Sequence, residues 1–399
     1  MKTLGIYLAA HPHSGGVFQY NLSVVRALET MQPRYRIIAY LADKTWSGLL
    51  PETFGQVYLD KNLLAKLLER LYRLFDRFDG HFRRTAMLFD PMVKAINRSD
   101  CDLVIFPSQD ILSYCVRKKS LASILDLMHR YEGQFEEYRN GEFELREQHF
   151  RDVCRHASGI LVDSEVGKLQ VMESYGVNGK NVFVLPFVPP EYLLQGKEVD
   201  VRRKYELPEK YLFYPAQFWE HKNHRNLLRA MKLLLDRGVP VNLVLVGAPK
   251  NHYREVLLEI DQLGLADHVF VLGFVSNDDM YSLYKNAVAL TFVSRIGPTN
   301  IPPREAMMVG CPVIVSNIYA MPEQVGDAAL LVDPVDPQDI ADKIEMVWND
   351  GALRDDLIEK GFMRISAYGQ QEFTQRLSDI VMSLDADGVS PGNDEASAA

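Results

Sequence analysis

Short apolar runs alternate with segments of helical periodicity along most of this chain, and that alternation limits the fold more than any other feature. The runs are rich in branched and aromatic residues, which favour strands. In the first half we predict strands at 4–9, 35–41, 103–106 and 160–162, with helices at 19–29 and 143–154. In the second half we predict strands at 211–215, 241–246, 269–272, 287–292 and 312–315, with helices at 224–236, 253–263, 278–286 and 303–309. Strands that alternate with helices build parallel sheets, so the expected fold class is α/β.

A chain of 399 residues is longer than one hydrophobic core usually organises. Three prolines within 185–190 exclude a helix interior or a central strand, and we interpret this segment as a hinge. We therefore predict two Rossmann-like domains, 1–187 and 188–370, whose parallel sheets face each other across a ligand-binding cleft. A long helical pattern over 337–384 is expected to cover the second sheet, its last part, 371–384, crossing back to the first domain, and the tail 385–399 is expected to be disordered.

Composition removes several other classes of protein. A formal charge of −9 and a pI of about 5.6 argue against nucleic acid as the main partner, because phosphate binding needs a basic face. The four cysteines form no CxxC pair and have no zinc-like spacing, which indicates buried free thiols in a reducing compartment. The first apolar run is followed at once by His11 and Pro12, which favours a strand over a secretory peptide. We expect a cytoplasmic protein.

The strongest local signal is the segment 295–306, which follows a predicted strand and leads into a predicted helix. Thr299 or Asn300 is suited to cap that helix, whose free N–H groups and positive dipole end suit an anion. We expect Glu305 in the first turn beside that anion. It either accepts hydrogen bonds from ribose hydroxyls or merely complements the helix dipole, and the residues alone favour neither.

Two further loops are candidates for binding a phosphate. Lys222 lies between a predicted strand and a predicted helix and is suited to reach a diphosphate oxygen, although a solvated loop is the alternative. Gly15 and Gly16 lie in the turn after the first strand and permit close approach of a ligand. The chain contains no GxGxxG and no GxxxxGK[ST] sequence, so nicotinamide dehydrogenases and P-loop NTPases lose their main support.

Taken together, these elements resemble the GT-B glycosyltransferases, specifically the retaining enzymes of glycosyltransferase family 4. The Gly-Pro-Thr-Asn form of the donor loop is similar to a branch of bacterial polysaccharide and O-antigen-type mannosyltransferases. The resemblance covers the chain up to its tail and is clearest from Tyr211 to Pro334. The segments that carry it are 298–307, 310–314, 323–329, 270–275, 162–165 and the proline-rich hinge.

The resemblance implies roles for individual residues. Glu305 corresponds to the second Glu of a Glu-x7-Glu motif that binds ribose hydroxyls, and Lys222 to the lysine that neutralises the diphosphate. The remaining donor-binding candidates are the backbone of Thr299, Asn300 and Ile301, the glycines Gly15 and Gly16, and the base-holding turn at Gly273 and Phe274.

Three positions depart from the family pattern. The first Glu of the motif falls at Gly297, and the Arg that assists the lysine falls at Gln217, which we keep as a donor-binding candidate. The His of a His-Asp pair falls at Leu125. Asp126 and His129 remain candidates for catalysis, and for His129 an ordinary structural role is an equal alternative.

The resemblance implies transfer of a hexose, with mannose from GDP-mannose favoured, to a hydroxyl of a growing lipid-linked glycan in bacterial surface polysaccharide synthesis. It implies retention of anomeric configuration without a metal or a cofactor. A catalytically silent protein that binds a nucleotide sugar or a partner is the alternative, and a sugar-phosphate synthase of the same architecture is a second one.

Leucines and arginines recur at helical spacing over 63–84. Such a helix either packs on the first domain with a solvated basic face, which we favour, or docks peripherally on anionic lipid at the inner face of the plasma membrane.

Overall fold

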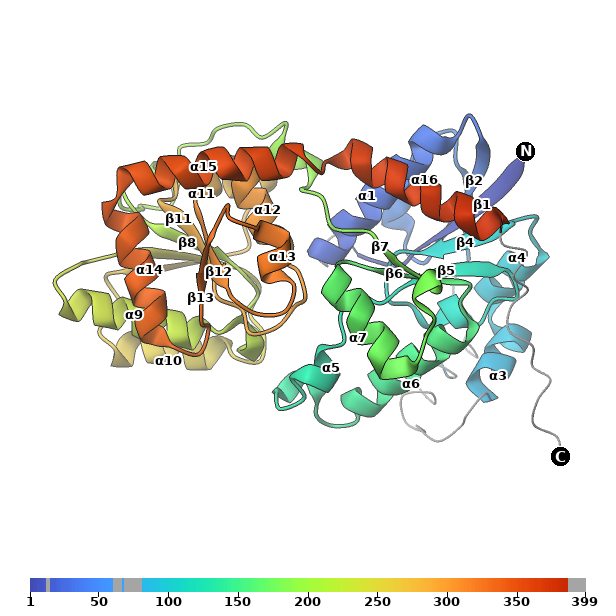
Figure 1. Ribbon diagram of the computed structural model, residues 1–399, viewed down its shortest axis with the longest axis horizontal. Coiled ribbons are helices and arrows are strands. Elements are labelled where there is room, and N and C mark those ends of the chain that lie inside the picture. Colours follow the sequence, from blue (N-terminus) through green and yellow to red (C-terminus); the bar gives the residue numbers. More distant parts are fainter. Residues whose placement is uncertain (12–14, 60–66, 68–80, 387–399) are drawn as a thin grey trace. The chain divides into compact units, whose positions relative to one another are not determined.

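The computed structural model describes residues 1–11, 15–59, 67 and 81–386. The chain divides into two compact units (Figure 1). Unit 1 is made of residues 1–186 together with the chain from Gln370 onward, and unit 2 is made of Phe187–Gly369. The domain boundaries expected from the sequence lay after residues 187 and 370. Most of the proposed lipid-docking helix, 63–84, and most of the tail lie outside the described residues.

Unit 1 contains, in its described part, a sheet of seven strands in the order β3-β2-β1-β4-β5-β6-β7, all of them parallel. The strands are β1 (Lys2–Leu8), β2 (Tyr35–Leu41), β3 (Gly55–Tyr58), β4 (Leu103–Phe106), β5 (Lys119–Ser123), β6 (Gly159–Val162) and β7 (Val182–Val184). The helices are α1 (Gly16–Met31), α3 (His81–Phe89), α4 (Pro91–Arg98), α5 (Met128–Tyr131), α6 (Glu142–His156), α7 (Glu165–Tyr175) and α16 (Gln370–Ala386). Residues of α4, α6 and α7 form one hydrophobic core with one face of the sheet.

Helix α16 brings the end of the described chain back to unit 1, where it lies beside α1 (Figure 1). The rings of Tyr20 and Phe373 meet edge to face with centroids 5.9 Å apart. The side-chain amide of Gln370 donates to the carbonyl of Ser23 at 3.0 Å. Helix α16 is therefore part of the first unit although it follows the second in sequence.

Unit 2 contains, within the described residues, a sheet of six parallel strands in the order β10-β9-β8-β11-β12-β13. The strands are β8 (Leu212–Pro215), β9 (Leu243–Val246), β10 (Val269–Gly273), β11 (Ala289–Phe292), β12 (Val313–Ser316) and β13 (Leu330–Val332). The helices are α8 (Val201–Lys204), α9 (His224–Asp236), α10 (Tyr253–Gln262), α11 (Asn277–Asn286), α12 (Ile301–Met308), α13 (Met321–Val325), α14 (Pro337–Asn349) and α15 (Gly351–Ser366). The four central strands β8, β9, β11 and β12 are almost wholly buried, as expected for a parallel sheet covered on both faces.

The predicted α/β class and its two parallel sheets are confirmed, and every strand predicted from an apolar run is present. The helical pattern predicted over 337–384 is present and is divided into three helices, α14, α15 and α16. The first break lies at Asp350, whose carboxylate caps α15 by accepting from the amide of Leu353 at 3.0 Å. The four cysteines are free, and all but Cys154 are buried.

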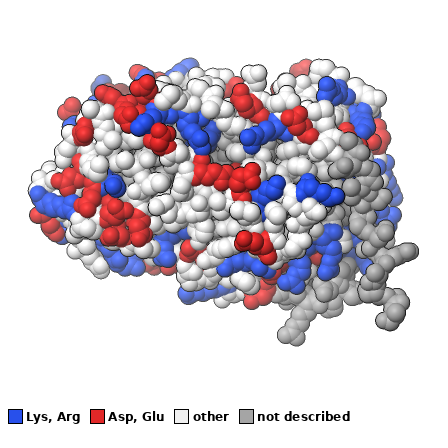
Figure 2. All heavy atoms as spheres, in the orientation of Figure 1, with Lys and Arg blue, Asp and Glu red and all other residues white. Residues whose placement is uncertain are grey.

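Among the described residues on the face shown in Figure 2, charged side chains of both signs are interspersed. Among residues 1–11, 15–59, 67 and 81–386, no helix combines the length and the apolar character needed to cross a bilayer.

Candidate functional site

The strand order of each sheet marks where a ligand is expected. In unit 2 the order reverses between β8 and β11, since β9 and β10 continue to one side and β12 and β13 to the other. Open parallel sheets bind ligands outside the carboxyl ends of the strands at such a reversal. The segment that carries Lys222 follows β8 and the donor loop follows β11, so both lie at this point.

The donor loop leads into α12, which begins at Ile301 rather than at the predicted residue 303. Asn300 is the N-cap residue, but its side chain makes no capping hydrogen bond to the helix. Prolines occupy the first turn, where an amide hydrogen is not required. Because α12 begins earlier, Glu305 lies in its second turn, and the prediction that Glu305 lies in the first turn is wrong.

Lys222 points its ammonium at this helix end. The Nζ atom lies 3.2 Å from Oδ1 of Asn300 and 3.5 Å from Oγ of Ser294. It also lies 5.1 Å from the centre of the Phe292 ring. Both oxygens are neutral, so these two contacts orient the cation without cancelling its charge. The main chain of Lys222 is held as well, because the Tyr214 hydroxyl donates to its carbonyl.

The backbone of Asn300 is bonded to Gln324, which lies in the segment 323–329 that carries part of the resemblance but was not itself a candidate site residue. The Asn300 amide donates to Oε1 of Gln324 at 3.2 Å, and Nε2 of Gln324 donates to the Asn300 carbonyl at 2.7 Å. In the structure the Asn300 amide is bonded to Gln324, and the contact of the Asn300 backbone with the donor stays a prediction. The contact that Asn300 makes toward the candidate site comes from its side chain.

Gly297 is required by this arrangement. Its φ of +110° lies in a region that L-residues rarely adopt. A Cβ atom at this position would lie 2.7 Å from Nδ2 of Asn300 and 3.1 Å from the carbonyl oxygen of Thr299. A glutamate, as in the commoner Glu-x7-Glu pattern, would thus displace the asparagine that contacts Lys222.

Glu305 is buried in unit 2 with only 7% of its surface exposed. The Tyr284 hydroxyl donates to Oε2 at 2.6 Å, and the Tyr192 hydroxyl donates to Oε1 at 3.1 Å. Burial raises the pKa of this carboxyl above its ordinary value, against the opposing effect of the two tyrosine hydrogen bonds. A carboxylate has about four acceptor positions, so the tyrosines fix its orientation and leave capacity for further donors.

Three other donor-binding candidates lie on the same edge of the sheet. Gly273 ends β10 with a φ of +72°, and its carbonyl accepts from the amide of Gly247 at 2.9 Å. Phe274 follows with 77% of its surface exposed, which is unusual for a large aromatic side chain. Gln217 lies in the loop after β8, where its Oε1 accepts from the indole of Trp219 at 3.0 Å.

In unit 1 the strand order reverses between β1 and β4. Gly15 is the N-cap residue of α1, directly after the β1 loop, and its φ of +62° and ψ of −126° favour glycine. Gly16 begins the helix, and both glycines are exposed. The carboxyl-edge position expected for these two residues is the one that the structure shows.

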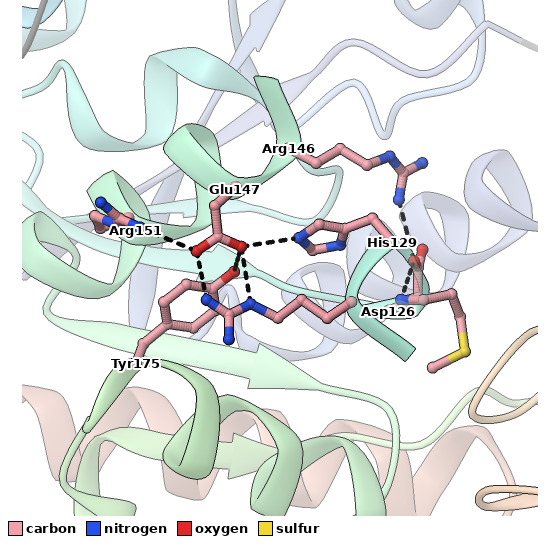
Figure 3. Close-up of polar contacts among 8 residues, drawn as sticks. Asp126, His129, Arg146, Glu147, Arg151 and Tyr175 are labelled. Atoms are coloured by element: carbon pink, nitrogen blue, oxygen red, sulfur yellow. Dashed lines mark hydrogen bonds and ion pairs between the residues drawn. The ribbon is translucent and has the colours of Figure 1, made fainter. Parts of the chain in front are cut away.

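Figure 3 shows the polar contacts of Asp126 and the network that contains His129. Asp126 follows β5, and its Oδ1 accepts from Arg146 at 3.1 Å and from the amide of Met128 at 3.2 Å. The side chain of His129 is fully buried, with its ring beside Phe143 and Phe150 and its Nε2 3.3 Å from Glu147. Burial lowers the pKa of His129. Because a proton-transfer group must reach its substrate, this enclosure favours the structural interpretation of His129.

Glu147 on α6 is the centre of that network (Figure 3). It accepts from Arg130 at 2.8 Å, from Arg151 at 3.2 Å and from the Tyr175 hydroxyl at 3.3 Å, besides facing His129. Burial alone would raise the pKa of Glu147, but the hydrogen bonds and charge of Arg130, with those of Arg151 and His129, lower it to about 2. The sequence held no motif for this cluster, apart from the helical spacing of Glu147 and Arg151.

This shift makes the stability of unit 1 depend on pH. The folded pKa of Glu147, about 2, lies below the ordinary value of 4.5, so its contribution is complete above pH 4.5 and is lost as the pH falls toward 2. We expect Glu147→Gln to lower the free energy of unfolding by about 1–2 kcal/mol at pH 6, allowing for solvent screening, and by much less at pH 3. Urea unfolding at the two pH values measures this, with the exposed Glu144→Gln of the same helix as control. An equal loss at both pH values would contradict the assignment.

Comparison with known proteins adds to this geometry. Residues 197–364 match the family described as Glycosyl transferases group 1. The O-antigen chain mannosyltransferase B of Escherichia coli is 30% identical over 177 residues, which are 44% of this chain and 46% of that protein. The O-antigen chain mannosyltransferase RfbU of Salmonella typhimurium is 29% identical over 183 residues, which are 46% of this chain and 48% of that protein. The chain thus spans about half the length of the curated relatives that it matches.

A solved structure matches over both units. The crystal structure of Anabaena Alr3699/HepE in complex with UDP and glucose has a TM-score of 0.71 and 16% identity, and the match covers 96% of this chain and 100% of that one. At this identity the likeness concerns the fold, which is GT-B. The segment matched by the family contains β8 to β13 and the donor-binding candidates of unit 2. Residues 197–364 are therefore similar to the Glycosyl transferases group 1 family, and the chain has the GT-B fold.

Proposed function

We propose that the chain is a retaining glycosyltransferase that moves a hexose, mannose being favoured, from a nucleoside-diphosphate sugar to a hydroxyl of a growing lipid-linked glycan. The observation that carries the proposal is the position of the Lys222 ammonium, 3.2 Å from the side chain of the N-cap residue of α12, where the strand order reverses. The matched O-antigen mannosyltransferases support mannose, with GDP-mannose as the first donor to test, and synthesis of bacterial surface polysaccharide as the setting.

The chemical difficulty of the reaction is the negative charge that develops on the departing diphosphate. A fixed ammonium and the N-terminus of α12 are preorganised to stabilise that charge, and stabilisation of this kind supplies most of the rate enhancement in many enzymes. The bond between the anomeric carbon and the diphosphate oxygen breaks as the acceptor oxygen attacks the same face of the sugar. The acceptor proton passes to the leaving phosphate, so no side chain needs to act as a nucleophile and no cofactor or metal is invoked.

The other candidates have supporting roles in this proposal. Exposed Phe274 and the turn at Gly273 contact the base, while Thr299 and Ile301 contribute backbone near the phosphates. Within unit 1, Gly15 and Gly16 allow close approach of a ligand. Asp126, whose side chain is 27% exposed, is more accessible to an acceptor than the fully buried His129.

Glu305 is proposed to accept hydrogen bonds from the ribose hydroxyls. We expect Glu305→Gln to weaken nucleotide binding about tenfold, because hydrogen bonds to a charged acceptor are lost, and to change kcat less. Isothermal titration calorimetry with GDP and UDP measures the affinity, and the exposed Glu255→Gln on α10 is the control. An unchanged affinity together with a lowered kcat would contradict the ribose role.

The proposal is tested with the full chain and a panel of nucleotide sugars, GDP-mannose first. Thermal shift identifies the donor that stabilises the protein, and proton NMR then follows the anomeric signal of released or transferred sugar. We expect slow hydrolysis of one donor, or its transfer to a glycan acceptor, with initial retention of configuration. Binding without either reaction would instead support the catalytically silent alternative.

A further inference from the structure

Gln324 lies on α13 with 7% of its surface exposed, and its amide group is fully committed to one neighbour. Its oxygen accepts from the Asn300 amide and its nitrogen donates to the Asn300 carbonyl. Burying an amide group costs free energy unless the group is hydrogen-bonded. The two hydrogen bonds of Gln324 therefore favour one position of the Asn300 backbone. The two residues are 24 positions apart, with Asn300 at the N-terminus of α12 and Gln324 on α13.

The main chain around Gln324 is fixed in turn by α15. The guanidinium of Arg364 donates through Nε to the Gln324 carbonyl at 3.0 Å and through Nη2 to the Glu323 carbonyl. These are the last carbonyls of the short helix α13, which have no partner within the helix itself. Arg364 therefore holds the element on which Gln324 stands.

Asn300 connects Gln324 to the candidate site. Because Gln324 fixes the backbone of Asn300, the Asn300 side chain starts from a fixed position, and its Oδ1 lies 3.2 Å from the Lys222 ammonium. Its Nδ2 occupies the space that Gly297 leaves open. A lysine side chain can adopt many rotamers. A neutral acceptor that contacts the ammonium favours some of these rotamers and leaves the charge of the ammonium unchanged.

We infer that Gln324 is a positioning residue that places the Lys222 ammonium, through Asn300, for the diphosphate of the donor. The inference rests on the proposed function, in which Lys222 meets the diphosphate. Gln324 itself touches no substrate in this scheme. Its effect must therefore pass through Lys222 and vanish when Lys222 is replaced.

The test compares nucleoside diphosphates with monophosphates, because the second phosphate is the part that Lys222 meets. Affinities of the full-length protein for GDP, GMP, UDP and UMP are measured by calorimetry, and the monophosphate-to-diphosphate ratio of Kd is formed for each base. The variants are Gln324→Leu and Asn300→Ala, each in the wild-type and the Lys222→Ala backgrounds.

We expect the wild-type protein to prefer the diphosphate of at least one base, and Lys222→Ala to lower that preference about tenfold or more, as for loss of a charge-assisted hydrogen bond. Gln324→Leu and Asn300→Ala should each lower the preference for diphosphate about fivefold in the wild-type background and less than about twofold in the Lys222→Ala background. The effects of residues that act through one another are not additive. Asn286→Ala is the matched control, because the side-chain amide of Asn286 donates to the Ser282 carbonyl within its own helix, α11, at 2.8 Å.

Two results would overturn the inference while leaving the proposed function intact. The first is that Gln324→Leu and Asn300→Ala both keep the wild-type preference for diphosphate while Lys222→Ala has lost it. The second is that these substitutions lower the preference by the same factor in the wild-type and the Lys222→Ala backgrounds. If Gln324→Leu fails to fold, Asn300→Ala carries the test, because alanine keeps both backbone bonds to Gln324. A wild-type protein without any preference for diphosphate, or a preference that survives Lys222→Ala, would instead overturn the proposed function and the inference with it.

Discussion

Replacement of Lys222 by alanine is expected to lower kcat about 10²–10³-fold, which is the usual cost of removing one preorganised group that stabilises charge on a leaving atom. The ammonium lies beside the N-terminus of α12, within 3.2 Å of Oδ1 of Asn300 and 3.5 Å of Oγ of Ser294. Its loss should therefore act on the step in which the diphosphate departs. Steady-state kinetics with the donor found by thermal shift measure the effect.

The control for this variant is Lys232→Ala. Lys232 lies on α9 of the same unit, where its ammonium pairs with Asp236 one turn away on the surface. Exposed pairs of this kind contribute little, so Lys232→Ala should keep wild-type kinetics. If Lys222→Ala raised KM alone and left kcat unchanged, the lysine would bind the ground state and the proposed role in departure of the diphosphate would be wrong.

Replacement of Gly297 by alanine is expected to lower kcat about 100-fold, and replacement by glutamate at least as much. An L-residue is strained at a φ of +110°, and its Cβ would lie 2.7 Å from the side-chain nitrogen Nδ2 of Asn300. A displacement of about 1 Å near reacting groups is enough for a loss of this size. Kinetics of both variants, with the melting temperature as a check of folding, measure the effect.

The glutamate variant separates two explanations of the donor loop. It restores the residue found in the commoner Glu-x7-Glu pattern, so a gain of activity would mean that Asn300 is dispensable and that its proposed role beside Lys222 is wrong. The control is Gly351→Ala at the start of α15, where φ is ordinary and the nearest atom to a new Cβ lies 3.5 Å away. That variant should behave as the wild-type protein.

The geometry of the donor loop offers a physical reason why a glycine at position 297 is paired with an asparagine at position 300. A Cβ atom at position 297 would lie 2.7 Å from Nδ2 of Asn300, so a larger residue there would displace the side chain that contacts Lys222.

Regions with a strong local pattern could be predicted from the sequence. The predicted bounds of β2, β4 and α9 equal the observed ones, because long apolar periods and flanking turns are local properties. The strands β3, β5, β7 and β13 were not predicted, since each is short or interrupted by polar residues, as in the Lys-Ser-Leu-Ala-Ser of β5. Their pairing with a neighbouring strand, and not their composition, makes them strands.

Periodicity and the order of elements along the chain were enough to predict the class of fold, the two parallel sheets, and which loops follow the strands where ligands bind. The partner of each polar side chain could be known only from the folded molecule: Gln324 for Asn300, two tyrosines for Glu305, and Glu147 for His129. Such partners are brought together by packing of segments distant in sequence, and no local pattern encodes the distance between them.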